Sequence, residues 1–359
     1  MELKYRNRKG KQSRMPDLYI IGAGCSKNYS QSNSNIKGLE SPLNKDFFKM
    51  ARRVIENTGM ENDLYFMDEV SNLISTISPL YGQAKEGLDF FEDKELTLED
   101  VMTLIDINDK LFAPFASPQN KLIESRELRI IKELLVRTLD YALIGFPCAK
   151  HSNLAKKMSS GDIVLSFNYD ILLDIALFNL GKITDYGYRM NFSKVRLDGQ
   201  WFTPKETQSE ITLLKLHGSL NWIRCGFCGA LLLHQYRKHT LIGAEEFRCP
   251  RCSSGENYAK RVIVPPAQSK DYGDRDIAFL WVLADRMLRE FSRIICIGYS
   301  FPVSDFDMIS LMRRFRARQT QVPEVIFVSP DKVAKKSLEK LLGKNVQHFD
   351  YLSDYLNAN

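Results

Sequence analysis

The chain has 359 residues, of which 44% are hydrophobic and 26% are charged, and its formal net charge is +6. This composition predicts an ordinary folded protein of one large or two modest domains and argues against intrinsic disorder. No apolar run approaches the roughly 20 residues that span a bilayer. The first 14 residues are too polar for a secretory signal, so we expect a cytoplasmic protein with no membrane partner.

The chain begins with a basic arm, residues 1–15, that carries six lysine or arginine side chains. Such an arm can contact nucleic acid. Basic tails are more often only solvated, and we expect no direct nucleic-acid partner.

Five short, β-branched and nearly continuously apolar runs predict buried parallel strands. They are residues 17–21, 163–167, 212–216, 293–297 and 325–328. Helical segments follow most of them, notably residues 171–180 and 306–318. The repeated order of strand and helix predicts an α/β fold with a Rossmann-like, doubly wound parallel sheet.

Between residues 45 and 158, apolar residues recur at spacings of three and four, which predicts a helical insertion. Thr97, followed by acidic residues up to Asp100, predicts the start of one of its helices. The chain therefore divides into a sheet domain, a helical insertion and a small cysteine module at residues 225–252. The sheet domain comprises residues 16–44, 159–224 and 253–359.

The most specific motif is a pair of Cys-x-x-Cys units, Cys225 with Cys228 and Cys249 with Cys252, separated by residues 229–248. The chain has seven cysteines, an odd number, which favours metal binding over disulfides. This spacing is typical of a zinc ribbon, in which four thiolates surround one Zn²⁺ ion. Because four protein ligands complete the coordination shell, we expect a structural metal. Four unligated, reduced cysteines are the alternative.

The first strand is followed by a glycine turn, Gly22-Ala23-Gly24, which lets the backbone approach a pyrophosphate. Gly22, Ala23, Gly24 and the nearby Ser26 are therefore candidate cofactor-binding residues. A dinucleotide fingerprint has a third glycine three residues beyond Gly24, where this chain has Lys27. A hydride-transferring dehydrogenase is accordingly disfavoured.

A second glycine turn, Gly298-Tyr299-Ser300, follows the strand at 293–297 and offers a hydroxyl to a phosphate or ribose. A simple tight turn is the alternative. Asp331, after the last strand, could accept hydrogen bonds from an adenine ribose, as acidic residues do in such folds. A helix cap explains Asp331 equally well.

Taken in chain order, the glycine turn, Asn168-x-Asp170, His217-Gly218, the cysteine pairs and Gly298-x-Ser300 resemble the sirtuin superfamily. The resemblance covers residues 16–335, except for the helical insertion. It implies a Rossmann-like domain that carries a zinc module and cleaves the bond between nicotinamide and ribose in NAD⁺.

Two departures separate the chain from protein-deacylating sirtuins. The Gln expected before the catalytic Asn is Phe167, and residues 25–44 contain no Ile-Pro-Asp-Phe-Arg type stretch. The segments 166–170 and 297–305 are instead similar to sirtuin-like effector domains of bacterial antiphage systems. That similarity implies an NAD⁺ hydrolase that depletes the cofactor as a toxic effector in abortive infection.

Asn168 does not ionise near neutral pH, and its amide can hold a water and a ribose hydroxyl. We predict that it positions the water. By resemblance, Asp170 binds the nicotinamide carboxamide. His217 follows a strand and has an unperturbed pKa of about 6.5, which suits a general base. A structural hydrogen-bonding role is the alternative for His217.

Two other functions use the same residues. An NAD-dependent protein-lysine deacylase would pass the ribose to an acyl-lysine oxygen, and a non-catalytic module would only sense NAD⁺ or a related nucleotide. A toxic effector needs restraint, so we expect a homo-oligomer and a partner protein of a defence system. That partner would be a nucleic-acid translocase or ATPase, or a nucleotide-processing enzyme, and the helical insertion is the candidate interface.

Overall fold

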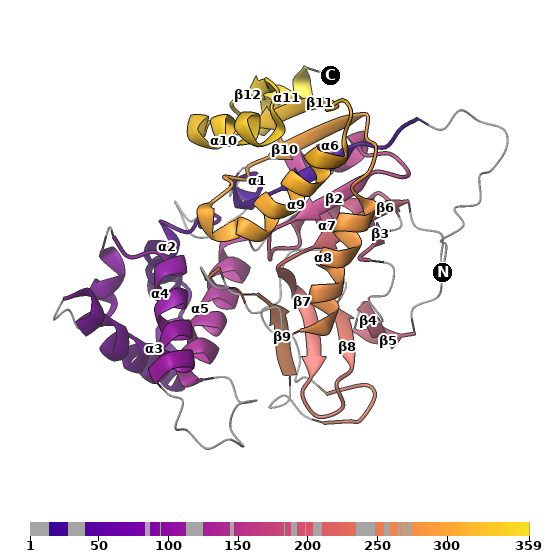
Figure 1. Cartoon of the computed structure of the whole chain (residues 1–359). Helices are drawn as coiled ribbons and strands as arrows, with labels where there is room; N and C mark the ends of the chain where they lie inside the picture. Colours follow the sequence, from indigo (N-terminus) through magenta and orange to yellow (C-terminus); the bar gives the residue numbers. More distant parts are fainter. Residues whose placement is uncertain are drawn as a thin grey trace.

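The computed structural model describes most of the chain (Figure 1). The described residues are 14–27, 40–82, 87–93, 95–112, 125–143, 147–182, 184–187, 192–197, 199–203, 210–234, 248–254, 259–264, 266–267, 270 and 274–358. Apart from positions 14 and 15, the predicted basic arm lies outside these residues.

The centre of the molecule is a seven-stranded sheet in the order β12-β11-β10-β1-β2-β6-β3, and all its pairings are parallel. All five predicted strands lie in it, each within one residue of its predicted bounds. The two edge strands, β3 and β12, were not predicted because they are only two and three residues long. The seven strands are β1 (Leu18–Ile21), β2 (Ile163–Ser166), β3 (Thr184–Asp185), β6 (Ile211–Lys215), β10 (Arg293–Ile297), β11 (Glu324–Val328) and β12 (Gln347–Phe349).

The strand order reverses at β1, with β2 and β6 on one side and β10, β11 and β12 on the other. One group of neighbouring helices is α6 (Ala149–Lys157), α7 (Leu172–Asn179) and α11 (Leu352–Asn357). The other is α8 (Arg275–Met287), α9 (Phe306–Arg318) and α10 (Lys332–Leu342). On the two sides of such a reversal, right-handed crossovers run in opposite directions along the sheet. They therefore place the two groups of helices on opposite faces of the sheet. The predicted doubly wound α/β fold is confirmed.

Helices from the predicted insertion form a separate lobe, residues 47–143, beside the sheet (Figure 1). The lobe has a hydrophobic core separate from that of the sheet, and this core contains Phe47, Phe48, Phe90 and Phe91. Asp63, Thr97 and Ser125 accept hydrogen bonds that cap three of its helices, including the start predicted at Thr97. The lobe helices are α2 (Phe47–Asn57), α3 (Leu64–Ile77), α4 (Leu98–Ile107) and α5 (Arg126–Ala142), with short turns η2 (Met60–Asn62), η3 (Ser78–Tyr81), η4 (Gly87–Glu92) and η5 (Asn108–Phe112).

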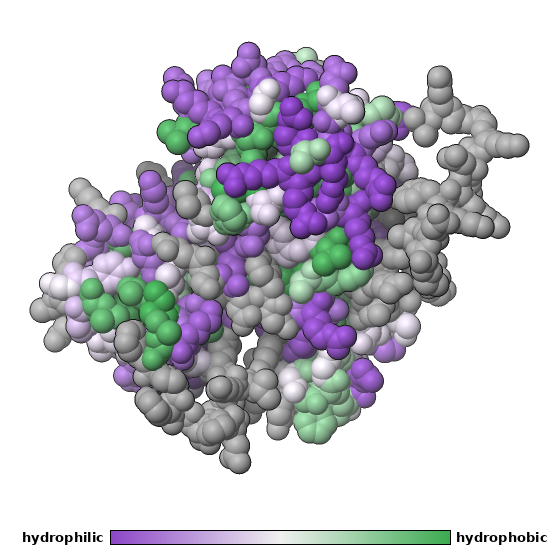
Figure 2. All heavy atoms as spheres, in the orientation of Figure 1, coloured by the Kyte–Doolittle hydropathy of each residue, from purple (hydrophilic) through white to green (hydrophobic). Residues whose placement is uncertain are grey.

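The lobe and the sheet differ in the character of their surfaces. Figure 2 shows apolar side chains gathered over the lobe, whereas the face over α9 and α10 is strongly hydrophilic. The exposed apolar residues of the lobe include Leu64, Tyr65, Leu80 and Leu111. None of the described helices combines the length and the apolar composition that crossing a membrane requires.

A second sheet, which the sequence did not predict, lies below the first in the order β5-β4-β8-β7-β9 (Figure 1). Its long strand β7 starts at Gly218, directly after His217, and ends at Cys225. The cysteine module is therefore the tip of this sheet. The strands are β4 (Phe192–Leu197), β5 (Gln200–Phe202), β7 (Gly218–Cys225), β8 (Leu231–His234) and β9 (Ala259–Ile263).

The two glycine turns meet backbone to backbone where the strand order reverses. The short helix α1 (Ala23–Ser26) starts there, and Gly24 N donates a hydrogen bond of 2.9 Å to Gly298 O. Gly298 has φ +61°, and a Cβ on it would lie 2.1 Å from Cys25 N. Cβ atoms on Gly22 and Gly24 would lie 2.6 and 2.9 Å from Gly298 O. All three glycines are thus required by the contact itself.

We predict that Gly298→Ala destabilises the fold by roughly 3 kcal/mol or more, because it adds a steric clash to a left-handed backbone. Gly343→Ala is the control, since Gly343 has φ +65° but its added Cβ would meet nothing closer than 3.9 Å. That change should cost only about 1 kcal/mol. Urea unfolding of both variants measures the difference, and equal losses would contradict the clash.

Candidate active site

The parallel register brings the predicted site segments to one edge of the sheet. Ile21 pairs with Ile297 on one side and with Ser166 on the other, and Ser166 pairs with Lys215. The residues that follow these four strand positions therefore start side by side. This edge, where the strand order reverses, is where doubly wound folds bind their ligands.

Asn168, Asp170 and Ser26 form a buried hydrogen-bonded chain there. Asn168 Nδ2 donates to Ser26 Oγ at 2.9 Å, and Ser26 Oγ donates to Asp170 Oδ2 at 2.5 Å. The carbonyl oxygen of the Asn168 side chain is buried and has no hydrogen-bond partner among the described residues. A buried acceptor of this kind is costly unless a ligand or water donates to it.

His217 lies in an aromatic cage and is 5% exposed. Its ring packs edge-on against Phe167 at 5.2 Å, with Tyr169 and Trp281 at 6.4 and 6.3 Å. Burial lowers the pKa of His217 to about 4, with Lys270 acting in the same direction and Asp305 opposing it. Nε2 has no hydrogen-bond partner in the described part of the chain. At neutral pH, His217 is therefore an uncharged imidazole with a nitrogen free to accept a proton.

Asp305 is a site residue whose role could not be assigned from the sequence. Its Oδ2 accepts a 2.5 Å hydrogen bond from Tyr299 Oη, and its Oδ1 lies 2.5 Å from Lys270 Nζ. Burial opposes its ionisation, but Lys270 and the Tyr299 hydroxyl hold the pKa of Asp305 below its usual value. Asp305 belongs to the segment 297–305 that the resemblance includes. Lys270 stands in no recognisable motif.

The second glycine turn and Asp331 make contacts within the protein itself. Tyr299 stacks on Phe167 with 4.4 Å between the ring centroids, and its hydroxyl is directed to Asp305. Ser300 is exposed. Asp331 caps α10, because its Oδ1 accepts hydrogen bonds of 2.9 Å from Val333 N and Ala334 N. The tight-turn and helix-cap alternatives fit these contacts, and binding of a phosphate or ribose by these residues stays a prediction.

The glycine turn after β1 also has a structural explanation. Gly22 and Gly24 pack against the backbone of Gly298, whereas Ala23 is exposed and Ser26 is buried. The close backbone contact accounts for both glycines without a ligand. An approach of this turn to a pyrophosphate stays a prediction.

A buried ion pair supports the Asn168–Asp170 turn from beneath. Lys215 Nζ donates to Asp170 O at 2.5 Å and to Asp174 Oδ2 at 3.2 Å, and Asp174 Oδ1 accepts from Tyr186 Oη at 2.7 Å. Lys215 and Asp174 are only 1% and 4% exposed. Their charges compensate one another in the interior, and the bond from Lys215 to Asp170 O ties the turn to the end of β6.

The four cysteines of the predicted zinc module form one cluster. Their sulfur atoms all lie within 4.8 Å of one another, with Cys225–Cys252 and Cys228–Cys249 separations of 3.7 Å. A tetrahedral metal with metal–sulfur bonds of about 2.3 Å requires sulfurs about 3.8 Å apart. The donor set and its spacing therefore fit a zinc ion.

The cysteine cluster is remote from His217. The eight residues of β7 separate the two, a span of roughly 25 Å for an extended strand. A metal held there has no access to the edge of the sheet where Asn168 and His217 lie.

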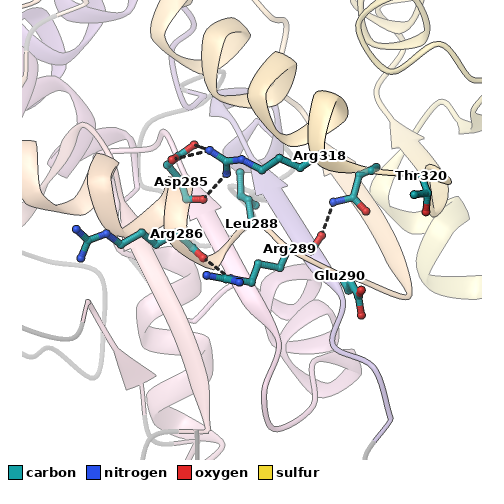
Figure 3. A pocket seen from close by; sticks show the side chains of 8 residues that line it. Asp285, Arg286, Leu288, Arg289, Glu290, Arg318 and Thr320 are labelled. Carbon is teal, nitrogen blue, oxygen red and sulfur yellow. Dashed lines mark hydrogen bonds and ion pairs between the residues drawn. The ribbon is translucent and has the colours of Figure 1, made fainter. Parts of the chain in front are cut away.

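A cavity in the described part of the chain lies away from these residues. It has a volume of about 870 Å³ and is lined by Asp285, Arg286, Leu288, Arg289, Glu290, Arg318, Gln319 and Thr320 (Figure 3). Glu290 precedes β10, so this cavity lies toward the amino ends of the strands. It contains none of the predicted site residues.

Comparison with known proteins leaves the chain without an assigned family. No family model and no curated protein matches it. A solved structure described as the structural basis for the mechanism and regulation of Sir2 enzymes shares 14% identity, with a TM-score of 0.36. The match covers 65% of this chain and 78% of that one. Because the overlap is this loose, the fold class stands on the sheet topology alone.

We predict that Lys215→Met destabilises the protein by roughly 3–5 kcal/mol, because Asp174 is left as an uncompensated buried charge. Adding Asp174→Asn removes that charge and should recover part of the loss, while the amide oxygen still accepts from Tyr186. Lys344→Met is the control, since Lys344 donates only to the carbonyls of residues 322 and 323. Denaturant unfolding tests this, and a double variant no more stable than Lys215→Met would refute it.

Proposed function

We propose that this chain hydrolyses NAD⁺ to nicotinamide and ADP-ribose. The observation that carries the proposal is the pair of buried atoms without partners, Asn168 Oδ1 and His217 Nε2, beside the edge where doubly wound folds bind nucleotides. The order of the motifs, which resembles the sirtuin superfamily, supports NAD⁺ as the ligand. The loose structural match contributes nothing to the proposal.

The reaction needs little covalent machinery, because nicotinamide bound as a pyridinium is a good leaving group. The protein must stabilise a ribose with oxocarbenium character and direct a water at its anomeric carbon. Asn168 already donates through Nδ2 to Ser26, so its free Oδ1 is the atom that accepts from the water or a ribose hydroxyl. The neutral His217 then accepts the proton that the water loses.

Asp170 differs from Asn168 in its available contacts. Its Oδ2 accepts from Ser26, and its Oδ1 accepts from Leu172 N at 3.0 Å. Each carboxylate oxygen still has a free lone pair. Asp170 can therefore accept from the amide group of nicotinamide, the role that the resemblance implies, while holding Ser26 in place.

The proposed biological role is that of a toxic NAD⁺-depleting effector in the cytoplasm of an infected bacterium. Restraint of such an enzyme calls for self-association or a partner protein, either a nucleic-acid translocase or ATPase or a nucleotide-processing enzyme. The lobe is the surface we propose for this contact, because Leu64, Tyr65, Leu80 and Leu111 are 79%, 67%, 59% and 65% exposed. Large exposed apolar side chains of this kind are found at interaction sites.

We expect the purified chain, alone or with its activating partner, to release nicotinamide from NAD⁺ without any peptide. Asn168→Ala and His217→Ala should each lower the rate by at least about 100-fold, because water positioning and proton acceptance are lost. Glu290→Gln, in the remote cavity of Figure 3, is the control and should leave the rate unchanged. Chromatographic detection of nicotinamide measures the rates.

The same assay separates the competing functions. Nicotinamide release that depends on an acylated lysine peptide would make the chain a deacylase. NAD⁺ binding by calorimetry that is unaffected by His217→Ala, with no release in any condition, would make it a binding module.

The cysteine cluster is proposed to hold one structural zinc ion, ligated by Cys225, Cys228, Cys249 and Cys252. Four thiolates leave no position for substrate, so the ion stabilises the tip of the second sheet. Elemental analysis should find about one zinc per chain, and Cys228→Ser should lose it. Cys296→Ala, a buried cysteine of β10, is the control and should retain it. Zinc retained by Cys228→Ser at wild-type stoichiometry would exclude this ligand set.

A further inference from the structure

Asp305 joins three functional groups at the start of α9. Its Oδ1 lies 2.5 Å from Lys270 Nζ and 3.9 Å from His217 Nε2, and its Oδ2 accepts from Tyr299 Oη. Lys270 Nζ also donates to Ser304 O at 2.5 Å. The side chains of Lys270 and Asp305 are 2% and 10% exposed, so this pair is shielded from solvent.

We propose that Asp305 is a positioning residue for His217: it pairs with Lys270 while His217 is neutral, and pairs with the imidazolium once His217 has taken a proton. This inference rests on the proposed function in one respect, that His217 is the base of the reaction. The 3.9 Å gap supports it, because a shift of about 1 Å would create a charge-assisted hydrogen bond.

The proton transfer can be written in full. The water oxygen bonds to the anomeric carbon of the ribose, and the bond from that carbon to nicotinamide breaks with its electron pair going to the ring nitrogen. The proton of the water passes to His217 Nε2, whose positive charge then faces Asp305. Release of that proton to solvent regenerates the neutral imidazole. The sum is NAD⁺ plus water giving nicotinamide, ADP-ribose and a proton.

Lys270 and Asp305 act on His217 in opposite directions. The ammonium of Lys270 lowers the pKa of His217, and the carboxylate of Asp305 raises it. Lys270 Nζ contacts Asp305 Oδ1, the same oxygen that faces His217. It therefore also weakens the attraction between Asp305 and the imidazolium form of His217. Removing Lys270 should therefore let Asp305 act on His217 unopposed.

Asp307, Tyr169, Tyr299 and Glu99 are further ionisable groups near this pair. Asp307 raises the pKa of His217 as the last of the contributing groups. Burial raises the pKa of Tyr169, whose hydroxyl donates to Val264 O, so it stays neutral. Tyr299 donates its proton to Asp305. Burial also raises the pKa of Glu99, which interacts with Asp305 and Lys270 from the first turn of α4.

The test is an NMR titration of His217 in protein labelled at its five histidines, with the signal identified by its loss in His217→Gln. In Lys270→Met, the titration midpoint of His217 should rise by at least about one pH unit. Adding Asp305→Asn should abolish that rise. Asp307→Asn is the control for removal of a nearby carboxylate and should change the midpoint least. Lys270→Arg should restore the wild-type midpoint.

Either of two results would overturn the inference: a His217 midpoint that Lys270→Met leaves unchanged, or a rise that persists in the double variant. Nicotinamide release provides a separate readout. His217 must be neutral to accept a proton, so activity falls below its pKa, and Lys270→Met should move that fall to higher pH. If the titrations behave as expected but no variant releases nicotinamide, the pairing stands and the hydrolase function fails.

Discussion

The site depends on the approach of two glycine turns at the point where the strand order reverses. Gly24 N donates to Gly298 O at 2.9 Å, and Gly22 N donates to Ile297 O at 3.0 Å. No side chain fits between these backbones. Because this contact sets the position of α1, it also sets where Ser26 meets Asn168 and Asp170. A larger residue at any of the three glycines would displace the hydrogen-bonded side chains of Ser26, Asn168 and Asp170, on which the proposed chemistry relies.

Several buried polar groups lie around this contact, and they differ in how many of their atoms have hydrogen-bond or ionic partners. Lys215 and Asp174 neutralise one another, and Asp305 has both Lys270 and Tyr299. Such groups stabilise a buried site only when they are paired, because the local dielectric constant is low. Asn168 Oδ1 and His217 Nε2, which have no such partner among the described residues, are the atoms that we propose a bound substrate and water contact. The paired groups therefore hold the candidate site together, and the unpaired atoms are the ones available to contact a substrate.

The second sheet connects the candidate active site to the cysteine cluster. β7 begins at Gly218, the residue after His217. Gly218 has φ +79°, and a Cβ on it would lie 2.0 Å from Val262 O, so this position requires glycine. The strand then runs to the cysteine cluster. The zinc ion that we propose there would stabilise this end of the sheet, where Ile223 and Leu232 form a small buried cluster with two of the cysteines. The proposed metal site and the proposed base therefore lie at opposite ends of β7 and take part in different chemistry.

The sequence alone determined the features that depend on local pattern: the strand bounds, the parallel doubly wound sheet, the cap at Thr97 and the clustering of the four cysteines. It also predicted that the candidate residues Asn168, Asp170 and His217 follow strands whose carboxyl ends lie at one edge of the sheet. Only the tertiary structure decided what surrounds them. Lys270 and Asp305 pair although α8 and β10 separate them in the chain, and the glycines of the two turns pack against each other. The edge strands β3 and β12 are too short to show a periodic pattern. These contacts arise between segments distant in the chain, where packing and shared burial, not local preference, select the partner.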